Sequence, residues 1–139
     1  MDLQILSNLR LAVRAALKAE YPTTDIYTAE ITSLIEEDDS NVVEFFTVFF
    51  SEGSEVEDGE DLDDYTYRTD TYLTVGYFHE KAERDQGWLD AEAGTIRQAV
   101  MALDDVFAGD IKRDGWQYLP SAEGSVPGIQ FKFAVNYSN

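Results

Sequence analysis

Few residues in this chain have the types and spacing that catalysis requires. His79, the only histidine, stands beside Glu80 and near Glu83, and these three form the one local set suited to acid–base work. A catalytic serine needs a base and an orienting acid, and the sequence has no nucleophile elbow, phosphate-binding glycine loop or HExxH spacing. We therefore predict that the protein is not an enzyme, and that His79 lies on the surface or at a strand end.

Metal binding has little support in the sequence. The chain has no cysteine and one histidine, which leaves few ligands for zinc. The segment Glu57-Asp58-Gly59-Glu60 does not match an EF-hand loop, which needs carboxylates at alternate positions, then a glycine and a distant glutamate, between two helices. We expect no defined metal site and no cofactor, beyond weak screening by Mg2+ or Ca2+.

The net charge of −18 limits the classes of partner. The chain has 28 acidic residues against 10 basic ones, and no Lys or Arg occurs between Lys18 and Arg68. A protein that binds duplex DNA gains affinity by replacing counterions with Lys and Arg, so this chain would be repelled by phosphates. Three interpretations remain: a solubilising surface, a surface that lies near nucleic acid without binding it, and a mimic of nucleic acid.

One long hairpin organises the sequence. The first arm, 42–50, is almost continuously apolar, and the returning arm, 65–79, alternates apolar and polar residues as a half-buried strand does. The connection 51–64 has no basic residue, and we expect it to be mobile in a lone subunit because nothing there can be buried or neutralised. Its acids are Glu52, Glu55, Glu57, Asp58, Glu60, Asp61, Asp63 and Asp64.

The first arm has more phenylalanines than a strand with a single buried face requires. Phe45 and Phe49 have one parity and Phe46 and Phe50 the other, so both faces are apolar. A stacking platform for single-stranded nucleic acid would need a basic groove beside them, which the sequence lacks. We interpret them as core or subunit interface, with Phe46 or Phe49 buried against another copy.

The rest of the chain predicts a single domain, 1–139, of the α+β class. Apolar stripes at helical spacing predict helices over 3–20 and 89–107, the second ended by Gly109. Alternation predicts strands over 24–35, 115–119 and 129–137, the first pairing antiparallel with 42–50 through an acidic turn. The expected architecture is a mostly antiparallel β-sheet with two α-helices packed on one face. The sequence shows neither a secretory signal nor a membrane-spanning stretch, so we expect a soluble protein without a membrane partner.

This order of elements resembles a known family, the phage tail terminators of the lambda minor tail protein U type. The segment 9–17 is similar to the family's opening helix, and the 42–50 strand with 72–78 resembles its central hairpin. Leu89-Asp90 opens the second helix, and 115–118 with 131–137 match the closing strand pair. Asn41 stands where we would expect a proline in the family, and the acidic connection is long.

The resemblance implies a non-enzymatic subunit of a hexameric ring in a bacteriophage or prophage tail. Such a ring terminates tail-tube polymerisation and provides the head-joining surface, so the implied partners are the tail tube protein and a head-completion or connector protein. DNA passes through without specific binding. The implied location is the virion tail, assembled in the bacterial cytoplasm. The candidate interface or lumen residues are then Phe46 and Phe49 together with the eight acids of 51–64.

Two other functions remain as alternatives. An acidic DNA mimic would inhibit a nucleic-acid-binding protein, and it requires carboxylates at phosphate-like spacing on rigid elements. A small enzyme would use His79. For the ring, the acidity has a physical role, because a wall that DNA slides past should repel phosphates.

Overall fold

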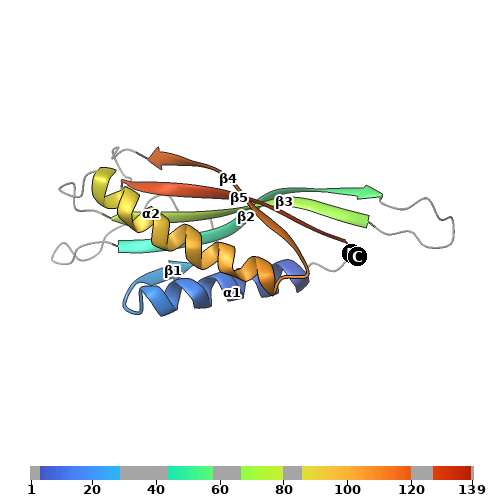
Figure 1. Cartoon of the computed structure of the whole chain (residues 1–139), viewed down its shortest axis with the longest axis horizontal. Coiled ribbons are helices and arrows are strands. Elements are labelled where there is room, and N and C mark those ends of the chain that lie inside the picture. The colour runs from blue at the N-terminus through green and yellow to red at the C-terminus, as the bar shows by residue number, and fades with distance from the viewer. Residues whose placement is uncertain (1–3, 29–43, 58–66, 80–85, 120–126, 139) are drawn as a thin grey trace.

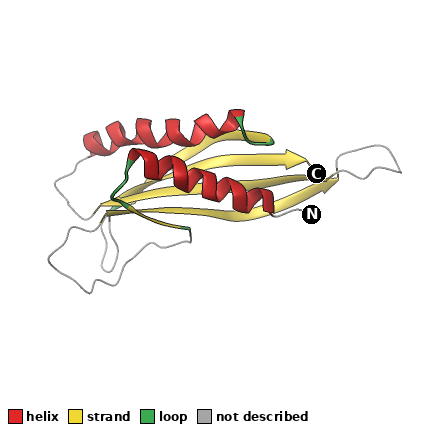
Figure 2. Ribbon diagram, turned by 90° about the horizontal axis from the view of Figure 1, so that it is seen from below, coloured by secondary structure: helices red, strands yellow, loops and turns green. Residues whose placement is uncertain are grey.

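The part of the chain that the structure describes forms one five-stranded sheet with two helices against one face (Figures 1 and 2). The structure, a computed structural model, describes residues 4–28, 44–57, 67–79, 86–119 and 127–138. The elements are α1 (Gln4–Glu20), β1 (Asp25–Tyr27), β2 (Glu44–Glu57), β3 (Tyr67–His79), α2 (Gln86–Met101), the 3-10 turn η1 (Ala102–Asp105), β4 (Gly109–Leu119) and β5 (Gly128–Ser138). The strand order is β1-β2-β3-β5-β4, and all pairs but β1 with β2 are antiparallel. This confirms the predicted α+β fold.

The helices form where the apolar stripes predict them. Leu9, Val13 and Leu17 of α1 recur at steps of four and are buried against the sheet. In α2 the buried residues are Ala93, Ile96 and Val100. The second helix was predicted to continue to residue 107, but the α-helix ends at Met101 and a 3-10 turn completes it.

The sheet presents one apolar face to these helices. Phe46 stands opposite Tyr77, and Val48 stands opposite Val75, in the antiparallel register of β2 and β3. Leu73, Val75 and Tyr77 in turn face Phe133, Phe131 and Ile129 of β5. Because alternate residues of a strand share a face, these rows make one continuous core under α1 and α2.

The first strand corrects a prediction. We expected an antiparallel hairpin of 24–35 with 42–50, but β1 pairs parallel with β2, with Ile26 opposite Phe46. The acidic turn suggested a hairpin, whereas the long connection between Tyr27 and Glu44 gives the chain enough length to return in the same direction. Residues 29–35 of the predicted strand lie outside the described residues.

The fourth strand also differs from the prediction. It begins at Gly109, six residues before the predicted start, and its register shifts between Arg113 and Trp116 around Gly115, whose φ is 108°. Gly109 was predicted to stop the second helix. It instead begins β4, where an added Cβ would lie 2.1 Å from the Asn136 carbonyl oxygen. Glycine is required there by the close approach of β5.

Phe46 and Phe49 provide a direct test of this core. Phe46 is fully buried between the Tyr21 and Tyr77 rings, whose centroids lie 5.0 and 4.8 Å away, whereas Phe49 is half-buried. We expect Phe46→Ala to lower the free energy of unfolding by about 3–5 kcal/mol, because it leaves a cavity. The matched variant Phe49→Ala should cost less than about 2 kcal/mol. Urea unfolding measures both, and equal losses would contradict this core.

Candidate interface surfaces

The two candidate interface phenylalanines, Phe46 and Phe49, lie on opposite faces of β2. Phe46 faces the helices and has no exposed surface in a single copy, so the structure places it in the core, one of the two roles predicted for these phenylalanines. The two helices cover more of the strand's apolar surface than the sequence suggested, because they lie over the face that Phe46 shares with Val48. Phe49 lies on the opposite face and is half-buried, so its role in an interface stays a prediction.

The opposite face of the sheet has a smaller apolar cluster of its own. Phe45 and Phe78 are buried there and stack with their ring centroids 4.9 Å apart, and Tyr27 and Leu119 pack against them. Neither α1 nor α2 covers this face (Figure 2). Farther along it, Lys132 Nζ lies 4.0 Å from the Tyr72 ring centroid, a cation–π contact. This face therefore combines half-buried aromatic residues with polar groups, as the rim of an interface does.

The acidic residues split into two groups. Glu52 and Glu55 are exposed on β2, and Glu57 is the last residue of that strand. The prediction of an unpaired connection from residue 51 is therefore wrong for 51–57, because residues 53–57 pair with 67–71 of β3. Ladder hydrogen bonds join backbone groups, so acidic side chains facing solvent do not prevent them. The other five, Asp58, Glu60, Asp61, Asp63 and Asp64, lie outside the described residues.

A one-residue bulge changes which side chains face the helices. Phe50 pairs with Leu73 but Gly53 pairs with Thr71, so β2 has one more residue than β3 across this interval. The Thr71 hydroxyl donates to the Glu52 carbonyl at 2.7 Å and fixes the bulge. The parity of β2 reverses there, and Glu55 comes to the sheet face that Phe46 occupies.

The hairpin keeps most of its negative charge. Arg68 lies 3.2 Å from Asp70 on the same strand, and both side chains are more than 40% exposed. This pair leaves Glu52 and Glu55 without a counter-charge among the ion pairs of the described residues. The described end of the β2–β3 pair extends past the ends of both helices (Figure 1).

His79 belongs to a buried polar cluster that sequence reasoning missed. Its Nε2 lies 3.2 Å from a carboxylate oxygen of Glu44, and the other Glu44 oxygen accepts a 2.5 Å hydrogen bond from the Thr24 hydroxyl. The register of the hairpin would have identified this cluster, because it pairs Glu44 with His79. The predicted neighbours Glu80 and Glu83 lie outside the described residues.

The geometry of this cluster suits a structural role. Thr24 and His79 are 4% and 5% exposed, so a substrate has little access, and Thr24 bonds to the acid rather than to the base that would activate it. Nearby, the Tyr21 hydroxyl donates to Glu92 of α2, and burial followed by this hydrogen bond raises the pKa of Tyr21 above its ordinary value. These contacts tie the end of α1 to the sheet and to α2.

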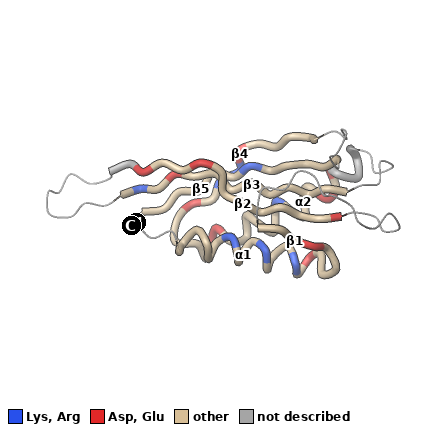
Figure 3. The backbone as a smooth tube through the Cα atoms, turned by 180° about the vertical axis from the view of Figure 1, so that it is seen from behind, with Lys and Arg blue, Asp and Glu red and all other residues tan. Residues whose placement is uncertain are grey.

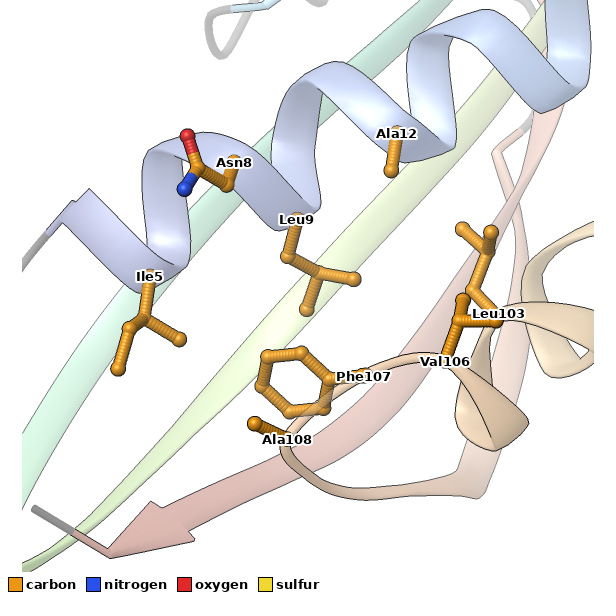
Figure 4. A pocket seen from close by; sticks show the side chains of 8 residues that line it. All are labelled: Ile5, Asn8, Leu9, Ala12, Leu103, Val106, Phe107 and Ala108. Atoms are coloured by element: carbon orange, nitrogen blue, oxygen red, sulfur yellow. The ribbon is translucent and has the colours of Figure 1, made fainter.

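An apolar groove lies between α1 and the turn after η1 (Figure 4). It has a volume of about 280 Å³, and Leu9, Leu103 and Phe107 are among the residues that line it. Val106 at its margin is 79% exposed. Within the described residues, no group of three His, Cys, Asp or Glu side chains could hold a metal ion. No described helix is long and apolar enough to cross a membrane.

Glu44 tests the structural role of the polar cluster. Glu44→Gln keeps the shape but removes the charge that faces His79, so we expect the free energy of unfolding to fall by about 1–3 kcal/mol. The control Glu55→Gln alters an exposed carboxylate and should change stability by less than about 0.5 kcal/mol. Chemical denaturation measures both, and a Glu44→Gln protein as stable as the original would show that the cluster contributes nothing.

Comparison with known proteins does not assign these surfaces. No protein-family model matches the chain, and no curated protein is significantly similar to it. The physical character of the surfaces must therefore indicate the function. They are an acidic hairpin, a sheet face with half-buried aromatic residues, and a helix whose outer side carries Lys and Arg (Figure 3).

Proposed function

We propose that the protein is a structural subunit of a bacteriophage or prophage tail. In this proposal, copies form a hexameric ring that terminates tail-tube polymerisation and provides the joining surface for the head. The observation that carries the proposal is the β2–β3 hairpin, which extends past both helices (Figure 1). Its strand β2 carries the exposed residues Glu52 and Glu55. A projecting arm on a compact body is a suitable shape for contacts between neighbouring subunits.

The fold supports the proposal through the order of its elements. An opening helix, a long hairpin, a second helix and a closing strand pair follow one another, as the sequence resemblance to tail terminators implies. A ring also needs two different surfaces that fit each other on neighbouring copies. The hairpin and the body offer such a pair, because they differ in charge and in shape.

The charge supports a role beside DNA without binding it. With 28 acids against 10 bases in each copy, a ring would surround its lumen with a strongly negative potential. Such a wall repels the phosphates of DNA that passes through. In the proposal the tail tube protein contacts one side of the ring, a head-completion or connector protein contacts the other, and assembly takes place in the bacterial cytoplasm.

One observation favours a second candidate, the acidic DNA mimic. A mimic needs carboxylates on rigid elements, and Glu52 and Glu55 stand on a paired strand rather than in a loop. A mimic acts as a monomer or dimer, and it would inhibit a nuclease or repressor by occupying its DNA groove. Solution mass and a nuclease-inhibition assay therefore separate the two functions.

We expect salt and Mg2+ to promote assembly of the ring. Copies of net charge −18 repel one another, and 0.1 M salt screens charges beyond about 10 Å while leaving contacts across an interface largely intact. Light scattering should show the mass rising from that of one copy at low salt toward about six copies when Mg2+ is added.

Two results would contradict the ring. A mass that falls as salt or Mg2+ is added would show that long-range repulsion does not limit assembly. A protein that stays monomeric in every condition and inhibits a nuclease would favour the mimic.

A further inference from the structure

The outer face of α1 is unusual in a protein of this charge. Leu11 is 56% exposed at its centre, and Arg14 and Lys18 follow at steps of three and four residues, so all three share one side of the helix. We call these three residues the α1 stripe. Arginine is among the residues enriched at the centres of interfaces, and here Arg14 stands beside an exposed leucine and a second cation.

The cations of α1 have no ionic partner within the described residues. Lys18 Nζ donates to the Thr24 carbonyl, which fixes the side chain but does not neutralise it, and Arg10 contacts the Ser7 hydroxyl. The ion pairs of the described residues are Arg68 with Asp70, His79 with Glu44, and Lys132 with Asp114.

The complementary surface lies on the β2–β3 hairpin. A groove of about 300 Å³ opens on the helix-facing side of the hairpin, and Leu6, Phe50, Thr69 and Thr71 are among the residues that line it. Glu55 lines the same groove, and its carboxylate is exposed. The groove therefore combines apolar lining residues with an exposed carboxylate. It is complementary to the α1 stripe, in which a leucine is followed by an arginine and a lysine.

The α1 stripe of the same chain cannot reach this groove. Leu6 lines the groove, and a helix rises 1.5 Å per residue, so Arg14 and Lys18 stand about 12 and 18 Å farther along α1. Their charges point away from the sheet, because the buried side of the helix is the row of Leu9, Val13 and Leu17. The carboxylates that the structure describes thus do not neutralise Arg14 and Lys18, which leaves both cations able to pair with a second molecule.

We propose that the α1 stripe of one copy docks into the hairpin groove of a second copy. Leu11 enters the groove beside Phe50 and Thr71, and Arg14 pairs with Glu55 of the second copy. The two surfaces differ, so the contact is heterologous and propagates from copy to copy until a ring closes. This contact supplies the interface of the proposed ring and rests on that proposed function.

Charge reversal at the two surfaces tests the contact. Arg14→Glu and Glu55→Lys should each raise the concentration needed for half-assembly by about tenfold, because each replaces attraction with repulsion. The double variant Arg14→Glu, Glu55→Lys restores opposite charges in the contact and should recover most of the assembly. Sedimentation velocity in 0.1 M salt with Mg2+ measures all four proteins.

The two single variants also separate this contact from general repulsion. Arg14→Glu makes the net charge more negative by two units, and Glu55→Lys makes it less negative by two. Net charge alone therefore predicts that Glu55→Lys assembles better than the original protein, whereas the contact predicts that it assembles worse. Lys112→Glu and Asp110→Lys, exposed on β4, are matched controls that change charge equally and should leave the contact intact.

The outcomes distinguish the contact from the ring. Improved assembly of Glu55→Lys, or a double variant no better than the single ones, overturns the contact while the ring remains. Unchanged assembly of Arg14→Glu also overturns the contact and indicates that the α1 stripe meets a different partner. An original protein that forms no oligomer in any condition overturns both.

Discussion

The antiparallel pairing of β2 with β3 is the constraint on which the rest of the structure depends. Its register sets Phe46 and Val48 under the helices and leaves Phe49 on the other face. The same register pairs Glu44 with His79 and so builds the buried polar cluster. Beyond Phe50 the bulge reverses the parity, which brings Glu55 to the helix-facing side, in the groove that Leu6 of α1 also lines. Core, polar cluster and projecting arm thus follow from one strand pair.

Charge acts in two opposing ways in this molecule. Over long distances the copies repel one another, because the net charge is −18. At short range the same chain offers three cations on α1 and exposed carboxylates on the hairpin. The long-range repulsion is screened by salt, while charge pairs at an interface are screened much less. In the proposed ring, subunits would stay monomeric at low concentration and low salt, and would associate through one contact when salt screens the repulsion.

The sequence predicts the helices and the fold class because their signals are local. A stripe such as Leu9, Val13 and Leu17 needs no knowledge of the rest of the chain. The parallel pairing of β1 and the length of β4 depend on which strands become neighbours, and periodicity does not report that. The acidic composition of 51–57 did not reveal that its backbone pairs with β3, because ladder hydrogen bonds do not involve the side chains. The same reason limits prediction of the candidate site. The burial of Phe46 and the partner of His79 depend on strand register, which periodicity does not report.

Electron microscopy of the assembled protein distinguishes a closed ring from other assemblies. A closed ring with an open lumen, whose subunits are related by rotation alone, is the result that this account predicts, because different surfaces meet at each contact. A two-fold symmetric dimer, in which the same surface of each copy meets itself, would contradict it. In such a dimer the hairpin of one copy would not contact the α1 stripe of the other.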